Sequence, residues 1–284
     1  MPPFYARKDW LLEDPDRTEA DVVRVLQVMS KRPLPEKENL FLSRAAIAHV
    51  FTSNKMEGTL PSDVNEYETF RLLECTFNAG PAAALKDGDF SKLQVQMSQH
   101  MEAFLLAWSL EGPLTVGDIQ RIHGVMMRGS PGIEAGVFRR GAAYGNRGAY
   151  NQYVYPEPAS IPELVDRALA RFNEAKPEDL HQAIQHATRF FLDLITAHPF
   201  ADGNGRLCRL LLAVALKRGK VPFPISLSTG HSKARTHYAR AIFMAQDAFN
   251  DVSIEENLGQ LRAIVLMSVH AKIANYVKHS GLAV

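Results

Sequence analysis

The sequence is short of three things: cysteine, long apolar runs and net charge. Two of the 284 residues are cysteines, Cys75 and Cys208, which is too few for a disulfide framework, so we expect a reducing, cytoplasmic setting. No apolar run reaches the roughly 18 to 20 residues that span a bilayer, and residues 1–10 do not resemble a signal peptide. The net charge is +1, which gives no bulk attraction to nucleic acid or to an anionic membrane. We therefore expect neither as a partner.

What the chain does contain is helical periodicity. Apolar residues make up 46% of the sequence and charged residues 22%, as in an ordinary globular protein. The spacing of the apolar residues predicts helices at 21–29, 42–54, 64–74, 93–110, 116–127, 163–174, 183–197, 206–217, 233–249 and 258–277. The predicted fold class is therefore all-α, in the form of a helical bundle.

Two stretches interrupt this pattern. Residues 78–89 contain Pro81 and several glycine, alanine and aspartate residues, and we predict a loop there. Residues 128–162 are rich in glycine, asparagine, proline and tyrosine, and 150–155 has the composition of a hairpin edge. A loop of this length inside a domain is usually functional or disordered, and the sequence leaves both possibilities open.

One short segment combines several features of an anion-binding site. Residues 198–209 read His-Pro-Phe-Ala-Asp-Gly-Asn-Gly-Arg-Leu-Cys-Arg. Pro199 cannot continue the helix predicted at 183–197, and the turn-forming residues that follow lead into the next helix. A glycine-rich turn at a helix N-terminus offers free N–H groups and a favourable dipole to phosphate. The segment therefore predicts a phosphate site.

The side chains of this segment add chemistry to that site. Arg206 and Arg209 lie on one face of the first helical turn, where forked guanidinium donors can bind phosphate oxygens. Asp202 is a hard oxygen ligand suited to Mg²⁺, and His198 can take a proton near neutral pH. Each feature alone is usually structural, but their combination in one short loop favours a functional phosphate-binding site over a structural turn.

The segment resembles the signature of the Fic family, His-x-Phe-x-Asp/Glu-Gly-Asn-Gly-Arg-x-x-Arg, and matches it at every defined position. The resemblance extends to the surrounding helices, over 93–250. It implies an all-α, Fic-type helical bundle with a short β-hairpin flap near the active site. It also implies a protein adenylyltransferase, which transfers AMP from ATP to a serine, threonine or tyrosine hydroxyl of a target protein.

The resemblance assigns roles to individual residues. His198 would be the catalytic base, Asp202 would bind Mg²⁺ at the ATP phosphates, and Phe200 would anchor the loop in the core. Catalysis would be mainly electrostatic and positional. The implied cofactors are thus ATP and Mg²⁺.

The remaining loop residues would bind the nucleotide. Gly203, Asn204 and Gly205 would form the anion nest, Arg206 would neutralise the phosphates, and Arg209 would hold the γ-phosphate. Related Doc-type kinases carry lysine in place of the second loop glycine, so Gly205 favours AMP transfer. The signature leaves open transfer of UMP or phosphocholine, and removal of AMP.

A second motif lies at 53–58, with the sequence Ser-Asn-Lys-Met-Glu-Gly. It resembles the Fic autoinhibitory pattern, in which Ser53, Glu57 and Gly58 would belong to an inhibitory helix at about 42–58. Glu57 would form a salt bridge with Arg209 in the place of the γ-phosphate. The alternative is a plain helix end, with Gly58 as its cap and Glu57 in solvent.

The resemblance also suggests a domain organisation. Residues 1–92 would form an N-terminal helical region with the inhibitory helix, 93–250 the Fic catalytic core, and 251–284 a C-terminal helix that closes the bundle or a homodimer. The flap, around 138–158, would dock the target by strand addition. Tyr150, Tyr153 and Tyr155 are candidate target contacts or automodification sites.

Two alternative functions remain open at this point. A hydrolase that removes AMP from a modified protein would use the same loop, with Glu57 positioning water. A non-enzymatic, nucleotide-binding regulator is the third hypothesis, although pure binding requires neither His198 nor Asp202.

Overall fold

The computed structural model describes residues 4–5, 14–58, 65–86, 90–146, 152–227, 234–247, 249 and 257–283. The helices in this part of the chain are Pro15–Lys31 (α1), Pro35–Met56 (α2), Glu66–Ala79 (α3), Pro81–Ala84 (α4), Lys92–Trp108 (α5), Val116–Met126 (α6), Ile161–Glu174 (α7), Leu180–Ala197 (α8), Asn204–Arg218 (α9), Ala234–Asp247 (α10) and Gly259–Ser280 (α12). The strands are Tyr144–Asn146 (β1) and Gln152–Val154 (β2). The chain is thus mostly helical with one small sheet, as the sequence predicted.

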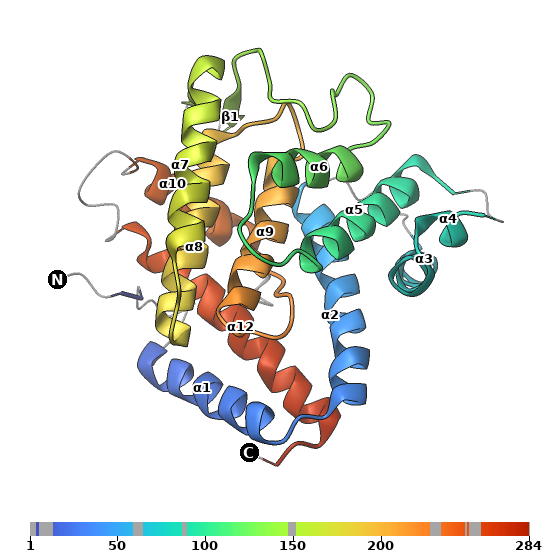
Figure 1. The fold of residues 1–284 in the computed structure, drawn as a ribbon, viewed down its shortest axis with the longest axis vertical. Helices are drawn as coiled ribbons and strands as arrows, with labels where there is room; N and C mark the ends of the chain where they lie inside the picture. Colours follow the sequence, from blue (N-terminus) through green and yellow to red (C-terminus); the bar gives the residue numbers. More distant parts are fainter. Residues whose placement is uncertain are drawn as a thin grey trace.

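Helix α9 forms the centre of the bundle. Its residues 206–216 are all buried, because the run Leu-Leu-Leu-Ala-Val-Ala-Leu at 210–216 is apolar on every face. Helix α8 packs along one side of α9, and α2 and α5 contact it on the other (Figure 1). This arrangement holds α9, whose N-terminus follows the glycine-rich loop, between α8 on one side and α2 and α5 on the other.

The outer helices cover this centre. Helix α7 packs on α8 through the stacked rings of Phe172 and Phe190, whose centroids are 4.2 Å apart. Helix α12 crosses below α8, and α1 packs against both of them (Figure 1). In the described residues, none of these helices combines the length and apolar character needed to cross a bilayer.

Each predicted helix overlaps a helix of the structure, and the differences have local causes. Helix α1 begins at Pro15 rather than at 21, because Asp14 caps its N-terminus by accepting from the Arg17 N–H at 3.0 Å. The loop predicted at 78–89 was partly wrong, since α4 lies inside it. Gly80, at φ 83°, ends α3, and Pro81 begins α4 at the position where proline is well tolerated.

The predicted hairpin exists, and its strand β2 lies within 150–155, where the sequence pattern indicated a hairpin edge. Strands β1 and β2 are antiparallel, and Tyr144 pairs with Val154. The hairpin lies at the end of the bundle where α8 ends (Figure 1). Tyr150 lies outside the described residues.

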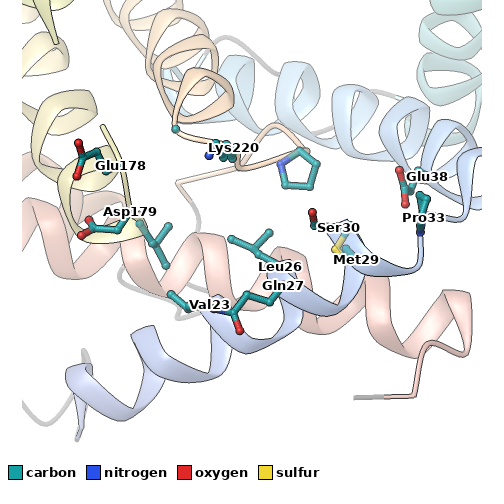
Figure 2. Close-up of a pocket in the computed structure, with 13 residues that line it drawn as sticks. Val23, Leu26, Gln27, Met29, Ser30, Pro33, Glu38, Glu178, Asp179 and Lys220 are labelled. Carbon is teal, nitrogen blue, oxygen red and sulfur yellow. The ribbon is translucent and has the colours of Figure 1, made fainter. Parts of the chain in front are cut away.

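A cavity of about 590 Å³ lies elsewhere in the molecule, between α1, the start of α8 and the turn after α9. Figure 2 shows Lys220 on the wall opposite Leu26 and Ser30 of α1. None of the predicted site residues lines this cavity. The phosphate site predicted at 198–209 lies at the opposite end of α8 from this cavity.

Candidate functional site

The candidate site begins at the turn that ends α8. His198 has left-handed backbone angles, φ 46° and ψ 57°, and its N–H donates to the Leu194 carbonyl at 3.0 Å. A non-glycine residue with positive φ is uncommon, and such residues concentrate at functional sites. Pro199 then prevents the helix from continuing. The chain therefore leaves α8 sharply, with His198 at the corner.

Asn204 closes the loop that follows. Its side chain accepts from the Phe200 N–H at 3.0 Å and donates to the Phe200 carbonyl at 2.7 Å. The Asn204 side chain is buried and therefore shapes the loop, whereas the sequence had placed this residue in the anion nest without separating side chain from backbone. Phe200 is fully buried, which confirms its predicted role as a core anchor.

His123 of α6 contacts the loop through its ring, and the sequence did not predict this contact. Its ring stacks on Phe200, with centroids 3.7 Å apart. The Gly136 N–H donates to His123 Nδ1 at 2.9 Å, so the proton lies on Nε2, which donates to the Asp202 carbonyl at 2.9 Å. Burial lowers the pKa of His123 to about 4, which keeps this neutral tautomer. A single histidine in a helix gives no sequence signal of such partners.

Asp202 presents its carboxylate to solvent beside a buried arginine. Its side chain is 59% exposed, and Oδ2 lies 3.3 Å from Nη2 of Arg206, whose side chain is 6% exposed. Oδ1 accepts from the Gly203 N–H at 2.6 Å. Gly203 has a φ of 78°, and a Cβ there would lie 2.8 Å from the Met127 sulfur. The loop therefore requires glycine at 203 on grounds of both conformation and space.

The N-terminus of α9 is open to an anion. Gly203 is the N-cap and has no side chain that could make a capping hydrogen bond at this end of the helix. The first turn of a helix has N–H groups without intrahelical partners, and the helix dipole adds positive potential there. The structure thus brings Asp202, Arg206 and the N-terminus of α9 together.

Arg209 lies one turn further along α9 and is held by distant parts of the chain. Its Nε donates to Ser53 Oγ and its Nη2 to the Ser53 carbonyl, both at 2.9 Å, and Nη2 also forms an ion pair with Glu57. The hydroxyl of Tyr238, on α10, is also close enough to Arg209 to interact with it electrostatically. Tyr238 was not predicted, because its sequence surroundings contain no nucleotide-binding pattern.

Glu57 reaches the first turn of α9 from the end of α2. It is the C-cap residue of α2, and Gly58 follows with a φ of 72°, so the segment is a helix end as well as a contact to Arg209. A Cβ at Gly205 would lie 2.4 Å from Glu57 Oε1. The Glu57 carboxylate, with a side chain 32% exposed, therefore lies directly over the glycine-rich turn.

His198 is enclosed on its other side by the hairpin. Its ring stacks on Tyr155, with centroids 3.8 Å apart and planes at 20°. Burial lowers the pKa of His198 to about 4, and the positive charge of Arg139 also lowers it, against the opposing effect of the Ile195 carbonyl. The imidazole is therefore neutral at physiological pH and able to accept a proton.

A cavity of about 350 Å³ lies beside His198, between the loop and the stem of the hairpin. Its walls include Ala201, Val137 and the β1 residue Tyr144. Tyr144 is largely exposed, so this wall also faces solvent. The cavity therefore offers an entering side chain a route to the imidazole from the hairpin side.

Two of the three tyrosines predicted to face a target lie in the described part of the hairpin. Tyr153 contacts Tyr155 edge to face, with centroids 5.1 Å apart, and Tyr155 covers His198. Stacking on His198 places Tyr155 within the candidate site itself, beyond the surface contact that the sequence suggested.

Residues 113–216 match the sequence model of the Fic/DOC family. The chain contains a Fic domain. The match includes α6, His123 and the whole loop from His198 to Arg209, whereas Glu57 lies outside it. The loop geometry described above is thus the geometry of this Fic domain.

Curated relatives carry the same family name. A protein from Aedes aegypti named protein adenylyltransferase Fic is 31% identical over 197 residues, which cover 68% of this chain and 37% of that protein. A relative of the same name from Drosophila melanogaster is 31% identical over 109 residues, or 38% of this chain and 21% of the relative. The chain therefore spans less than half of the length of these relatives.

Solved structures show the same fold over most of the chain. A Fic-domain-containing signaling protein from Bacteroides thetaiotaomicron superposes with a TM-score of 0.75 at 17% identity, covering 94% of this chain and 98% of that one. Fic-1 from C. elegans superposes with a TM-score of 0.69 at 17% identity, covering 94% and 73%. The shared fold thus extends well beyond the Fic domain, into the helices that surround it.

Proposed function

We propose that this chain is a protein adenylyltransferase. The main support for this proposal is the position of His198. Its neutral imidazole lies between the 350 Å³ cavity, which we call the acceptor cavity, and the N-terminus of α9. A target serine, threonine or tyrosine hydroxyl gives its proton to His198 while its oxygen attacks the α-phosphorus of ATP. The new bond joins AMP to the target, and pyrophosphate leaves. The names of the relatives support this reaction.

The nucleotide side of the site suits Mg-ATP. Among the described residues, no three histidine, cysteine, aspartate or glutamate side chains gather as a metal site. Mg²⁺ is commonly bound by one or two carboxylates together with substrate phosphates, which fits the single exposed carboxylate of Asp202. When bound, Mg²⁺ would neutralise phosphate charge. Arg206 lies behind Asp202 and would bind the phosphates at the uncapped helix end.

Glu57 accounts for how this activity is restrained. Arg209 is the second arginine of the proposed phosphate site, and Ser53 and Glu57 accept hydrogen bonds from its Nε and Nη2. We propose that the γ-phosphate competes with Glu57 for Arg209, so residues 1–92 would act as an inhibitory region on the catalytic core at 93–250. The target would dock along β1. Formation of a homodimer through the last helix, within 251–284, remains a separate prediction.

A second candidate is removal of AMP from a modified target. The observation in its favour is the Glu57 carboxylate, which is partly exposed over the glycine-rich turn and can orient a water molecule there. The two activities differ in the effect of Glu57: its loss would increase transfer but abolish hydrolysis. Supplying the AMP-modified protein to wild type and Glu57→Gly separates them.

The pH dependence of transfer should reflect the low pKa of His198. Because burial lowers this pKa to about 4, the base is already neutral at pH 6, and the rate should not fall between pH 8 and pH 6 through protonation of His198. Protonation should remove activity only as the pH approaches 4. Initial rates of the Glu57→Gly variant at saturating Mg-ATP test this expectation. An acidic limb with a midpoint near 6.5, which His198→Ala eliminates, would contradict it.

The nature of the transferred group decides the proposed function. Glu57→Gly protein with Mg²⁺ should become labelled by ATP carrying ³²P at the α-phosphate and not by ATP carrying it at the γ-phosphate. Phosphoryl transfer would give the opposite pattern. Absence of label from both nucleotides, on the protein itself and on proteins of a cell lysate, would reject a transferase.

A further inference from the structure

Arg139 and Arg140 are neighbours in sequence but have opposite environments. Arg140 is exposed, with an ion pair of 3.8 Å to Glu134, whereas Arg139 is 7% exposed. The three guanidinium nitrogens of Arg139 each donate to a different backbone carbonyl. Nε donates to His198 at 2.7 Å, Nη1 to Gly141 at 2.8 Å and Nη2 to Pro156 at 2.5 Å.

These three carbonyls belong to three segments of the acceptor side. Gly141 precedes β1 and Pro156 follows β2, so one guanidinium joins both legs of the hairpin to the catalytic turn. The Arg139 N–H adds a fourth link, to the Pro199 carbonyl at 2.9 Å. The hairpin is therefore attached to the carbonyl of His198 through a single side chain.

This arrangement is costly, which argues that geometry is its purpose. Burial lowers the pKa of Arg139, against the attraction of Glu157, because a buried cation loses hydration that neutral carbonyls only partly replace. A planar guanidinium can bind three carbonyls in fixed directions, whereas a lysine ammonium donates from one nitrogen atom. Shape as well as charge is thus required at position 139.

We propose that Arg139 is a positioning residue, which holds the target-docking hairpin at a fixed distance from the His198 imidazole. The proposal rests on the function proposed above. The four links lie on the acceptor side of His198, whereas Asp202, Arg206 and Arg209 form the nucleotide side. Arg139 therefore acts on the approach of the hydroxyl and leaves ATP binding unaffected.

The test uses Arg139→Lys and Arg139→Gln in the Glu57→Gly protein, with Arg24→Gln as the control, since Arg24 is a largely exposed arginine of α1, which lies at the opposite end of the bundle from the hairpin (Figure 1). The transfer rate should fall by roughly 100-fold in both Arg139 variants, since a misplacement of about 1 Å can cost that much. The KM for ATP should stay within about twofold, and Arg24→Gln should leave both quantities unchanged. Retained helical circular dichroism and thermal melting would show that the variants are folded.

Hydrogen exchange of the hairpin amides, at 141–146 and 152–155, provides a readout that does not depend on catalysis. Faster exchange in the Arg139 variants, together with slow transfer and an unchanged KM for ATP, would support the proposal. Unchanged exchange, unchanged transfer, or a loss of ATP affinity equal to the loss of rate would each overturn it. If the Glu57→Gly parent transfers no AMP, the proposed function fails, and the exchange result still decides whether Arg139 fixes the hairpin.

Discussion

Replacing Glu57 with glycine is expected to raise AMP incorporation by roughly 10- to 30-fold. The carboxylate is paired with the buried guanidinium of Arg209, and a hydrogen bond between charged groups contributes about 1.5 to 3 kcal/mol. We take the lower part of this range because the Glu57 side chain is 32% exposed and partly screened by solvent. About 1.4 kcal/mol corresponds to a factor of ten. Incorporation from α-labelled ATP at subsaturating ATP measures the effect.

The control must separate lost inhibition from a weakened helix end. Lys55 is exposed, in the last turn of α2, and Lys55→Gly removes helix propensity without touching the Arg209 contact. Lys55→Gly should behave as wild type, and Glu57→Gln should fall between wild type and Glu57→Gly because it loses the charge but keeps the shape. Equal incorporation by wild type and Glu57→Gly would mean that the contact with Arg209 does not restrain the enzyme.

Loss of His198 is expected to reduce transfer by about 100- to 10,000-fold, the usual contribution of a positioned general base. The effect is measured by comparing Glu57→Gly with the double variant Glu57→Gly/His198→Ala, so that inhibition does not hide it. His181→Ala is the matched control, since His181 lies in the first turn of the same helix, α8, at the end remote from the loop. His181→Ala should transfer AMP at the parent rate.

The left-handed backbone at His198 requires a check on the structure of the double variant. Alanine is less tolerant of positive φ than histidine or asparagine, so the loop could shift for reasons unrelated to the base. His198→Asn tolerates this conformation and cannot act as a base near neutral pH. Both variants should bind ATP as the parent does while losing transfer. Transfer that survives in His198→Asn would refute the assignment of His198 as the base.

The sequence by itself determined the local features of the site. Residues 198–209 are contiguous, so the proline, the glycines and the start of α9 fix one another through backbone geometry within a few residues. The run at 210–216 also favours burial of that part of α9, because a helical segment that is apolar on every face lies inside the bundle. These features depend on residues that are close together in the sequence, so the order and spacing of the residues predict them.

Tertiary structure alone decided which distant residues meet this loop. The resemblance pointed to Glu57, but its contact with Arg209 joins residues 152 positions apart and depends on how α2 packs beside α9. Tyr238, His123 and Arg139 reach the loop from three other segments, and no pattern in their own sequence surroundings names a partner. Periodicity shows which face of a helix is buried but not what covers it. The partners of Arg209 and His198 were therefore set by packing, and the chemistry of the loop by its sequence.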